Sequence, residues 1–200
     1  MYKVAEVFTS IQGEGKYSGT AATFIRLAMC NLNCDFGGGL KCDDLAHKNP
    51  PAIMDWAQLK AGLRPNIRHV VITGGEPTIH PEVAQLIAEL KRVGKFVQIE
   101  TNGFELSRVS KADWITYAPK RGGFVGNEGF DEVKLLVGGN YMPTEEQLTT
   151  YFKHIEHKYL SPVNYMDTLN GDSLAKTVNL ALQYPDWKIS LQIHKILGVR

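Results

Sequence analysis

The residues Thr23-Phe24-Ile25-Arg26-Leu27-Ala28, followed after Met29 by Cys30-Asn31-Leu32-Asn33-Cys34, join a strand-like run to a cysteine loop. The run is rich in β-branched and aromatic residues, which favours a buried strand. Cys42 follows, and these three cysteines are the only ones in the chain. Three thiolates can hold three irons of a 4Fe–4S cluster and leave the fourth iron open to a substrate or cosubstrate.

Two other uses of these cysteines remain open on spacing alone. Thiolates also suit zinc, and His47 could complete a tetrahedral structural site, so spacing does not separate a zinc-stabilised binding module from an open cluster. A disulfide is a weaker interpretation, because the cysteine count is odd and the sequence has no apolar signal segment.

The length and charge of the chain limit how many domains it can form and which partners it can bind. With 200 residues the chain fits one domain of ordinary size, so we expect residues 1–200 to form a single domain. Lys plus Arg number 22 against 21 Asp plus Glu, a formal charge of +1 that gives no electrostatic argument for a nucleic-acid or membrane partner. Apolar runs fall short of the about 20 residues that a membrane span requires. We therefore expect a soluble, cytoplasmic protein.

Short β-branched or aromatic runs recur along the chain between helical patterns and predict strands. The middle six of these runs have the buried, apolar character of parallel strands. The predicted strands are Tyr2 to Phe8, Thr23 to Ala28, His69 to Thr73, Phe96 to Thr101, Trp114 to Ala118, Glu132 to Val137, Tyr159 to Tyr165 and Lys188 to His194.

Three helices are expected between the strands. The clearest spans Pro81 to Val93, with apolar residues at three- and four-residue steps, and Gly94 should end it. Thr144 and Gln147 have capping-box spacing and predict the start of a second helix, and a third covers Asp172 to Tyr184.

Alternating strands and helices indicate a parallel sheet with crossover helices, in which ligands gather at the carboxyl ends of the strands. Polar loops follow three of the predicted strands at that edge. They are the cysteine loop, Gly74-Gly75-Glu76-Pro77 and Glu100-Thr101-Asn102-Gly103. The stretch from Asp35 to Pro51 is expected to be irregular.

The Gly74-Gly75-Glu76-Pro77 loop has two interpretations. Paired glycines let the backbone approach a ligand, and Glu76 offers a carboxylate to a cationic group. An ordinary turn explains the same residues, because Gly-Gly followed by X-Pro is common turn chemistry. The cysteine loop one strand earlier favours the ligand site.

Taken together, the two loops resemble those of the radical S-adenosylmethionine (radical SAM) enzymes. Phe8-Thr9-Ser10-Ile11-Gln12-Gly13-Glu14-Gly15 resembles the signature of one family among them, the 7-carboxy-7-deazaguanine synthases. Further segments similar to that family are Phe24-Ile25-Arg26, Glu100-Thr101-Asn102-Gly103, Ala118-Pro119-Lys120 and Gln192-Ile193-His194-Lys195. The resemblance covers nearly the whole chain.

The resemblance implies a shortened, partial (β/α) TIM-like barrel of the radical SAM type that forms a homodimer. It implies a 4Fe–4S cluster, S-adenosylmethionine and Mg²⁺ as cofactors, and an electron donor such as flavodoxin or ferredoxin. The implied reaction converts 6-carboxy-5,6,7,8-tetrahydropterin to 7-carboxy-7-deazaguanine with loss of ammonia. A glycyl-radical activase is a less suitable alternative, because Gln12 to Gly15 and His194 would have no role in it.

For the cofactors, the resemblance implies that Cys30, Cys34 and Cys42 hold the cluster. It places the methionine amino group of S-adenosylmethionine at the glycine loop and the rest of that cofactor at later strand ends. The implied contacts are Lys41, Cys42, Asp43, Gly74, Gly75, Glu76, Ala118, Pro119, Lys120, Ser161, Pro162, Val163 and Asn164.

For the pterin, the resemblance implies that Arg26 holds the carboxylate, a role for which the guanidinium fork is well suited. His194, expected in the last strand, would assist at the same carboxylate. The remaining implied contacts are Ile11, Gln12, Gly13, Glu14, Thr73 and the terminal Arg200.

The chain departs from the family pattern in its cysteine loop. Many members have the spacing CX3CX2C, whereas seven residues, including Gly37-Gly38-Gly39, separate Cys34 from Cys42. Lys41 stands where an aromatic residue is usual, and Phe36 is the candidate replacement.

Three further positions differ from the family. Its Mg²⁺-binding threonine is replaced by Asp44, whose carboxylate is a suitable ligand for a hard cation, although a surface aspartate is the alternative. Ala118 and Ser161 replace a serine and a glutamine that are common in the family.

Overall fold

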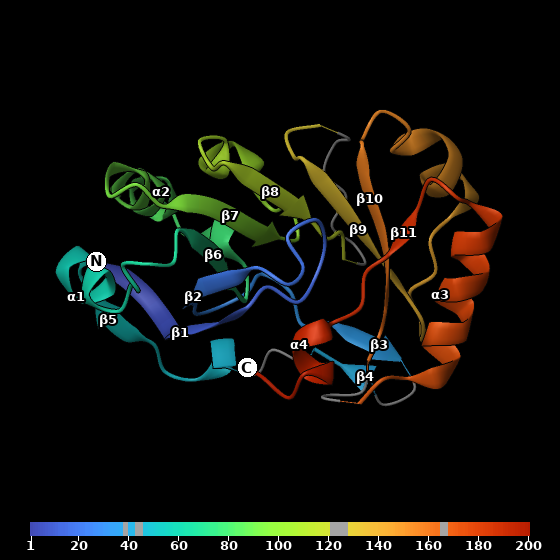
Figure 1. Ribbon diagram of the computed structural model, residues 1–200, viewed down its shortest axis with the longest axis horizontal. Helices are drawn as coiled ribbons and strands as arrows, with labels where there is room; N and C mark the ends of the chain where they lie inside the picture. Colours follow the sequence, from blue (N-terminus) through green and yellow to red (C-terminus); the bar gives the residue numbers. More distant parts are fainter. Residues whose placement is uncertain (38–39, 43–45, 121–127, 165–167) are drawn as a thin grey trace.

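The computed structural model describes residues 1–37, 40–42, 46–120, 128–164 and 168–200 (Figure 1). Its main feature is a nine-stranded sheet with the order β11-β10-β9-β8-β7-β6-β2-β1-β5, and β3 and β4 form a separate hairpin. The strands are β1 (Tyr2–Ile11), β2 (Ala21–Leu27), β3 (Asp35–Gly37), β4 (Leu40–Lys41), β5 (Ala52–Met54), β6 (His69–Gly74), β7 (Phe96–Thr101), β8 (Trp114–Tyr117), β9 (Glu132–Val137), β10 (His157–Pro162) and β11 (Lys188–Ile189).

The strands from β2 through β6, β7, β8, β9 and β10 to β11 run parallel, and β1 and β5 are antiparallel at one edge. The six strands predicted to be parallel are confirmed, and β11 joins them. This curved sheet has the architecture of a partial TIM-like barrel (Figure 1). The carboxyl ends of its parallel strands therefore meet at one edge.

The helices α2 and α3 lie along the outer face of the sheet, whereas the short η1 and α4 lie near the C-terminus and not on that face (Figure 1). In α2, Val83, Leu86, Ile87 and Leu90 are fully buried, as the apolar stripe predicted, and Gly94 after it has a φ of +77°. The helices are α1 (Trp56–Ala61), α2 (Val83–Arg92), α3 (Gly171–Gln183), α4 (Ile193–Ile196), the 3-10 helices η1 (Ala46–Lys48), η2 (Pro77–Ile79) and η3 (Leu106–Val109), and the π-helical turn η4 (Gln147–Tyr151). None of the described helices is long and apolar enough to cross a membrane.

Alternation along the strands separates a hydrophobic core from a polar interior. In β2, Ile25 and Leu27 belong to the core, whereas Phe24 and Arg26 line an inner pocket. The same alternation in β9 buries Val133, Leu135 and Val137 in the core and turns Lys134 and Leu136 inward. Successive side chains of a strand point to opposite faces, so one sequence pattern builds both the core and the site.

Three predicted elements differ from the structure. The last strand was expected to reach His194, but β11 ends at Ile189 and α4 follows, because the Ile193 amide donates to the carbonyl of Gly13 (3.1 Å) instead of pairing with β10. The strand expected over Tyr159 to Tyr165 is β10, which begins at His157 and ends at Pro162. The stretch from Asp35 to Pro51 contains the β3–β4 hairpin and η1 rather than only irregular chain.

The capping box at Thr144 is confirmed. The Thr144 amide donates to the Gln147 side chain (2.9 Å), and the Gln147 amide donates to the Thr144 hydroxyl (3.2 Å). The segment that follows becomes π-helical over Gln147–Tyr151 instead of continuing as a regular α-helix.

The loop between β1 and β2 packs across the amino ends of the parallel strands. The ring of Tyr17 meets His69, Phe96 and Trp114 edge-on, with centroids 5.0 to 5.2 Å apart, and these three residues begin β6, β7 and β8. This contact fixes the loop beneath the barrel. It also determines where the polar residues that precede Tyr17 enter the interior.

Glu132 holds the same loop from the amino end of β9. Its carboxylate accepts the Lys16 amide (2.8 Å), and a Cβ at Gly15, which has a φ of +66°, would lie 2.0 Å from it. Burial and the nearby Glu100 carboxylate raise the pKa of Glu132 from 4.5 to about 7. The folded protein therefore retains a proton on Glu132 at pH values where the unfolded chain has lost it.

Replacing Glu132 with Gln tests this arrangement. Because the pKa is higher in the fold than in the unfolded chain, the contribution of Glu132 to stability falls as the pH rises from about 4.5 to about 7. Glu132→Gln lacks this loss, so its free energy of unfolding relative to wild type should rise by about 1–3 kcal/mol between about pH 5 and about pH 8, measured by urea denaturation. Glu156→Gln, at a side chain 88% exposed, is the control. A difference that stays constant with pH would contradict the raised pKa.

Candidate active site

A pocket of about 370 Å³ opens at the carboxyl ends of the parallel strands. Its walls come from both ends of the chain, the cysteine loop, and the strands and loops from β1 to β10. All of the residues predicted to contact the pterin line it: Ile11, Gln12, Gly13, Glu14, Arg26, Thr73, His194 and Arg200.

The residues predicted to contact S-adenosylmethionine reach the same pocket, with two exceptions. Pro119 lies between two lining residues without lining the pocket itself, and Asp43 falls outside the described residues. Asp44, the predicted Mg²⁺ ligand, and the side chain of His47 also lie outside them. The lining residues of this set are Lys41, Cys42, Gly74, Gly75, Glu76, Ala118, Lys120, Ser161, Pro162, Val163 and Asn164.

Cys30, Cys34 and Cys42 all line this pocket and are partly exposed, and the structure places them in no disulfide. Among the described residues, no group of three or more His, Cys, Asp or Glu side chains is arranged to hold a metal ion. Cys30 packs against the glycine loop, because its Cβ lies only 2.9 Å from the point where a Cβ on Gly75 would stand.

The two glycines of that loop lie against the backbone that leads to Cys30. A Cβ on Gly74, where φ is +136°, would stand 2.0 Å from the carbonyl oxygen of Leu27, and one on Gly75 would stand 1.9 Å from that of Met29. The Gly75 amide donates to Leu27 (3.2 Å) and the Glu76 amide to Met29 (2.9 Å). The paired glycines are therefore required by the contact between two backbones, a reason that their sequence alone did not indicate.

The carboxylate of Glu76 is buried and accepts four hydrogen bonds. Two come from the amide and hydroxyl of Thr78, at 2.9 and 2.7 Å. The others come from the Thr101 hydroxyl and the Asn102 amide, both at 2.6 Å. Asn102 also donates through its side chain to Asn31 (2.9 Å) in the cysteine loop. One carboxylate thus joins the loops that follow β6 and β7, and Asn102 extends the network to the loop after β2.

Lys134 lies at the centre of a buried charge cluster on the inner face of the sheet. Its ammonium contacts the Glu14 carboxylate and lies 3.2 Å from that of Glu100. Gln12 and Gln98 donate to the same Glu100 oxygen, at 3.1 and 2.9 Å. The cluster brings residues of β7, β9 and the amino-terminal loop together in the pocket.

The pKa values of the charged groups in this cluster shift in different directions. Burial raises the pKa of Glu14, but the Lys134 ammonium more than offsets it and holds that pKa below its usual value. Burial raises the pKa of Glu100 above its usual range, in spite of Lys134. Burial lowers the pKa of Lys134, but the two carboxylates outweigh it and raise that pKa. Lys134 therefore stays cationic and Glu14 stays anionic near neutral pH.

Arg26 and the chain terminus meet at Glu6. The Arg26 Nε donates to the Glu6 carboxylate (2.7 Å), and Arg200 forms an ion pair with the same group. Both guanidinium groups also lie over the Phe8 ring, which stacks on Phe24 with centroids 5.0 Å apart. Two cations and two aromatic rings therefore form one wall of the pocket.

His194 reaches the pocket from α4 and not from a strand. A Cβ on Gly13 would stand 1.8 Å from its Nδ1, so the imidazole packs directly on the Gly13 backbone. Gln192, one residue before α4, accepts a hydrogen bond from the side chain of Asn164 (2.8 Å). These contacts hold the carboxyl-terminal segment over the pocket.

Sequence reasoning did not single out Lys134 or Glu6, and it did not predict that Gln12 and Gln98 contact Glu100. A signal for Lys134 was present, because Glu132 and Lys134 alternate with Val133 and Leu135 in an otherwise apolar strand. Such alternation indicates a polar inner face. The partners, however, come from distant parts of the chain.

Comparison with known proteins supports the family suggested by the motifs. The model of the radical SAM superfamily matches residues 25–126. A 7-carboxy-7-deazaguanine synthase from Bacteroides thetaiotaomicron is 36% identical over 200 residues, which cover 100% of both chains. Another from Neisseria meningitidis is 31% identical over 208 residues, covering 99% of this chain and 94% of the relative.

The fold agrees with these matches. The crystal structure of QueE from Escherichia coli superposes with a TM-score of 0.69 and 28% sequence identity, and the match covers 96% of this chain and 93% of that one. The cysteine loop and the glycine loop both lie within the region matched by the superfamily. The chain therefore belongs to the radical SAM superfamily and, within it, to the 7-carboxy-7-deazaguanine synthase family.

Proposed function

We propose that this chain converts 6-carboxy-5,6,7,8-tetrahydropterin to 7-carboxy-7-deazaguanine, with release of ammonia, in 7-deazapurine biosynthesis. The observation that carries the proposal is the lining of one pocket by the three cysteines, the glycine loop and a set of charged side chains suited to a carboxylated pterin. The full-length similarity to 7-carboxy-7-deazaguanine synthases supports the same reaction.

The residues of the cysteine loop fit an iron–sulfur cofactor. Three partly exposed thiols open onto the pocket, and thiolates are the usual ligands of such clusters. When bound, the 4Fe–4S cluster and S-adenosylmethionine supply the radical that starts the reaction. The chain itself places Gly74, Gly75 and Glu76 beside Cys30, where their backbone and carboxylate would bind the methionine end of that cofactor.

Another part of the pocket would bind the pterin. Arg26 is oriented by Glu6 toward the pocket and would pair with the substrate carboxylate, with His194 and Arg200 beside it. Glu14 would accept hydrogen bonds from the amine edge of the ring. Because Lys134 keeps Glu14 ionised, Glu14 can act only as an acceptor, which matches the N–H groups of that edge.

Other parts of the proposal rest on the sequence and the family. Asp44 would supply the oxygen ligand for Mg²⁺. The chain would work as a single-domain homodimer in the cytoplasm, with a flavodoxin or ferredoxin as electron donor. The fate of the product would be set by other enzymes.

The reaction is tested with anaerobically reconstituted protein. We expect iron–sulfur absorbance, reductive cleavage of S-adenosylmethionine, and formation of 7-carboxy-7-deazaguanine from the carboxytetrahydropterin, measured by mass spectrometry. Cleavage of S-adenosylmethionine without this product would contradict the substrate. A colourless protein with tightly bound zinc and no cluster would contradict the radical mechanism.

Replacing Arg26 tests the carboxylate site. Arg26→Ala should lower kcat/KM for the pterin by about 10- to 150-fold, because a charge-assisted hydrogen bond contributes about 1.5–3 kcal/mol. Arg26→Lys should recover only part of the lost kcat/KM, since an ammonium lacks the guanidinium fork. The Kd for S-adenosylmethionine should stay unchanged.

The matched control is Arg92→Ala, which removes an arginine whose side chain is 69% exposed on α2. Its steady-state parameters should equal those of wild type. Equal losses of pterin and S-adenosylmethionine binding in Arg26→Ala would argue for general damage to the pocket instead of a carboxylate contact.

Replacing Lys134 tests the buried charge cluster. Lys134→Met leaves Glu14 and Glu100 buried without their cation, so the free energy of unfolding should fall by about 3–5 kcal/mol. Lys176→Met, which breaks an exposed pair with Asp172 on α3, should cost at most about 1 kcal/mol. Urea denaturation measures both variants, and similar losses would show that burial does not strengthen the Lys134 contacts.

A further inference from the structure

The residues between Cys34 and Cys42 form a hairpin. In its stem, Asp35 pairs with Lys41 and Gly37 pairs with Leu40. The Cys42 amide donates to the carbonyl of Cys34 at 3.4 Å, so the two cysteines face each other at the open end of the stem. The lengthened connection therefore has a defined geometry in its described residues, and that geometry brings the backbones of two cysteines together.

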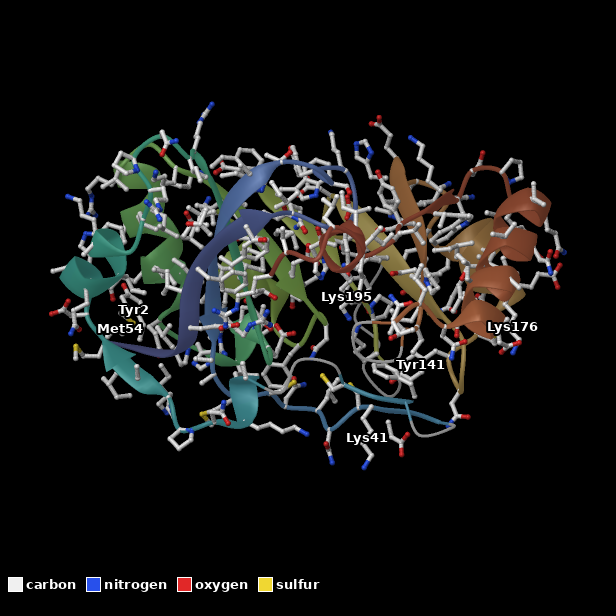
Figure 2. All side chains as sticks on the ribbon, turned by 60° about the horizontal axis from the view of Figure 1, so that its bottom comes forward. Tyr2, Lys41, Met54, Tyr141, Lys176 and Lys195 are labelled. Atoms are coloured by element: carbon white, nitrogen blue, oxygen red, sulfur yellow. The ribbon has the colours of Figure 1, made fainter. Side chains whose placement is uncertain are left out.

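The hairpin packs on a turn from the other side of the barrel. Gly138 and Tyr141 exchange backbone hydrogen bonds of 2.7 and 3.0 Å and close this turn just after β9. The Asn140 amide in the turn donates to the carbonyl of Phe36 (2.6 Å). The rings of Phe36 and Tyr141 meet edge-on with centroids 5.0 Å apart. Figure 2 shows Tyr141 beside the hairpin strand that carries Lys41.

Glycines allow the hairpin and the turn to approach this closely. Gly139 has a φ of +57°, and a Cβ there would stand 1.9 Å from the Phe36 oxygen. Gly37 has a φ of +78°, and a Cβ there would stand 2.6 Å from the Asn140 side chain. The hairpin and the turn thus each contribute a glycine at the point where the other segment comes closest. This indicates a specific contact between the two segments.

The turn is itself held by the barrel. A Cβ on Gly138 would stand 2.0 Å from the Ser173 hydroxyl in the first turns of α3. Phe36 is buried and packs with Val163, which follows β10, and with Leu136 of β9. Cys34 contacts the same small cluster. The position of Cys34 is therefore linked through Phe36 to β9 and to the residue that follows β10, and the turn beside Phe36 rests on α3.

We propose that the turn Gly138–Tyr141 is the positioning element for the cluster-binding cysteines of this chain, with Tyr141 and Gly139 as its positioning residues. An insert with three consecutive glycines has high conformational entropy and would not by itself hold two thiols at a fixed separation. The contact with the turn supplies that restraint. The proposal rests on the use of a 4Fe–4S cluster by this chain.

The packing of Phe36 against Val163 has a second consequence. Val163 belongs to the segment proposed to contact S-adenosylmethionine, and it touches the residue that holds the hairpin. Loosening the hairpin should therefore change both the assembly of the cluster and the response of the assembled cluster to S-adenosylmethionine.

The test compares Tyr141→Ala, Tyr141→Phe and the control Met142→Ala, whose side chain is half exposed next to the turn. Iron and sulfide per chain are measured after anaerobic reconstitution, and electron paramagnetic resonance spectra of the reduced cluster are recorded with and without S-adenosylmethionine. Tyr141→Ala should lower iron affinity by about twofold to tenfold, which corresponds to the loss of one aromatic contact. It should also broaden the spectrum. Tyr141→Phe keeps the ring contact and should lose less iron than Tyr141→Ala, and Met142→Ala should match wild type.

A second pair of variants separates the contact from general strain. Gly139→Ala and Gly94→Ala both place a Cβ at a positive φ, but only Gly139 has a neighbour within 4 Å. Only Gly139→Ala should lose iron and alter the spectrum, while cooperative thermal unfolding of each apoprotein confirms that it folds. Wild-type iron content and spectra in both Tyr141→Ala and Gly139→Ala would overturn the proposal. A wild-type protein that binds no cluster would instead overturn the proposed function.

Discussion

The buried carboxylate of Glu76 is the interaction on which the rest of the site depends. It accepts hydrogen bonds from the loop after β6 and from the loop after β7, and Asn102 extends the same network to Asn31 in the cysteine loop. A buried acceptor that loses its donors costs about 1–3 kcal/mol per group, so these loops are coupled in energy as well as in space. The parallel sheet brings three loops to one edge, and this carboxylate fixes their relative positions.

Burying charged groups in the pocket costs free energy, which the hydrophobic core must offset. Lys134, Glu14 and Glu100 are removed from water, and their mutual attraction compensates only because every member has a charged partner. Such a cluster contributes little net stability compared with an apolar interior. Its benefit is chemical, because it fixes the protonation state of Glu14 within the pocket. The fully buried stripe of α2 and the apolar positions of β6, β7 and β9 supply the stability instead.

Local patterns in the sequence predicted the central strands well and the site only in part. The run Glu132 to Val137 matches β9 because a short, largely apolar and β-branched run is typical of a parallel strand, and nearly all of its residues are buried. The β3 and β4 strands have three and two residues, which is too short for any period, so the hairpin was not predicted. His194 was placed in a strand, because its helix is determined by a contact with Gly13 about 180 residues earlier. Motifs identified the residues of the pocket, but the ion pairs of Lys134 depend on distant partners that no local pattern encodes.

In the wall proposed to bind the substrate carboxylate, Arg26 of β2 is joined by residues from the two ends of the chain. Arg200 pairs with Glu6 across 194 positions, and His194 rests on Gly13. The helix α4, which carries His194, has no buried residue, so polar contacts with the amino-terminal strand and loop hold it rather than a hydrophobic face. Segments held in this way open at lower free energy than a core strand. The carboxyl-terminal part of this wall is therefore the part of the pocket that the core fixes least, whereas Arg26 in the same wall is fixed by β2, a parallel strand of the central sheet.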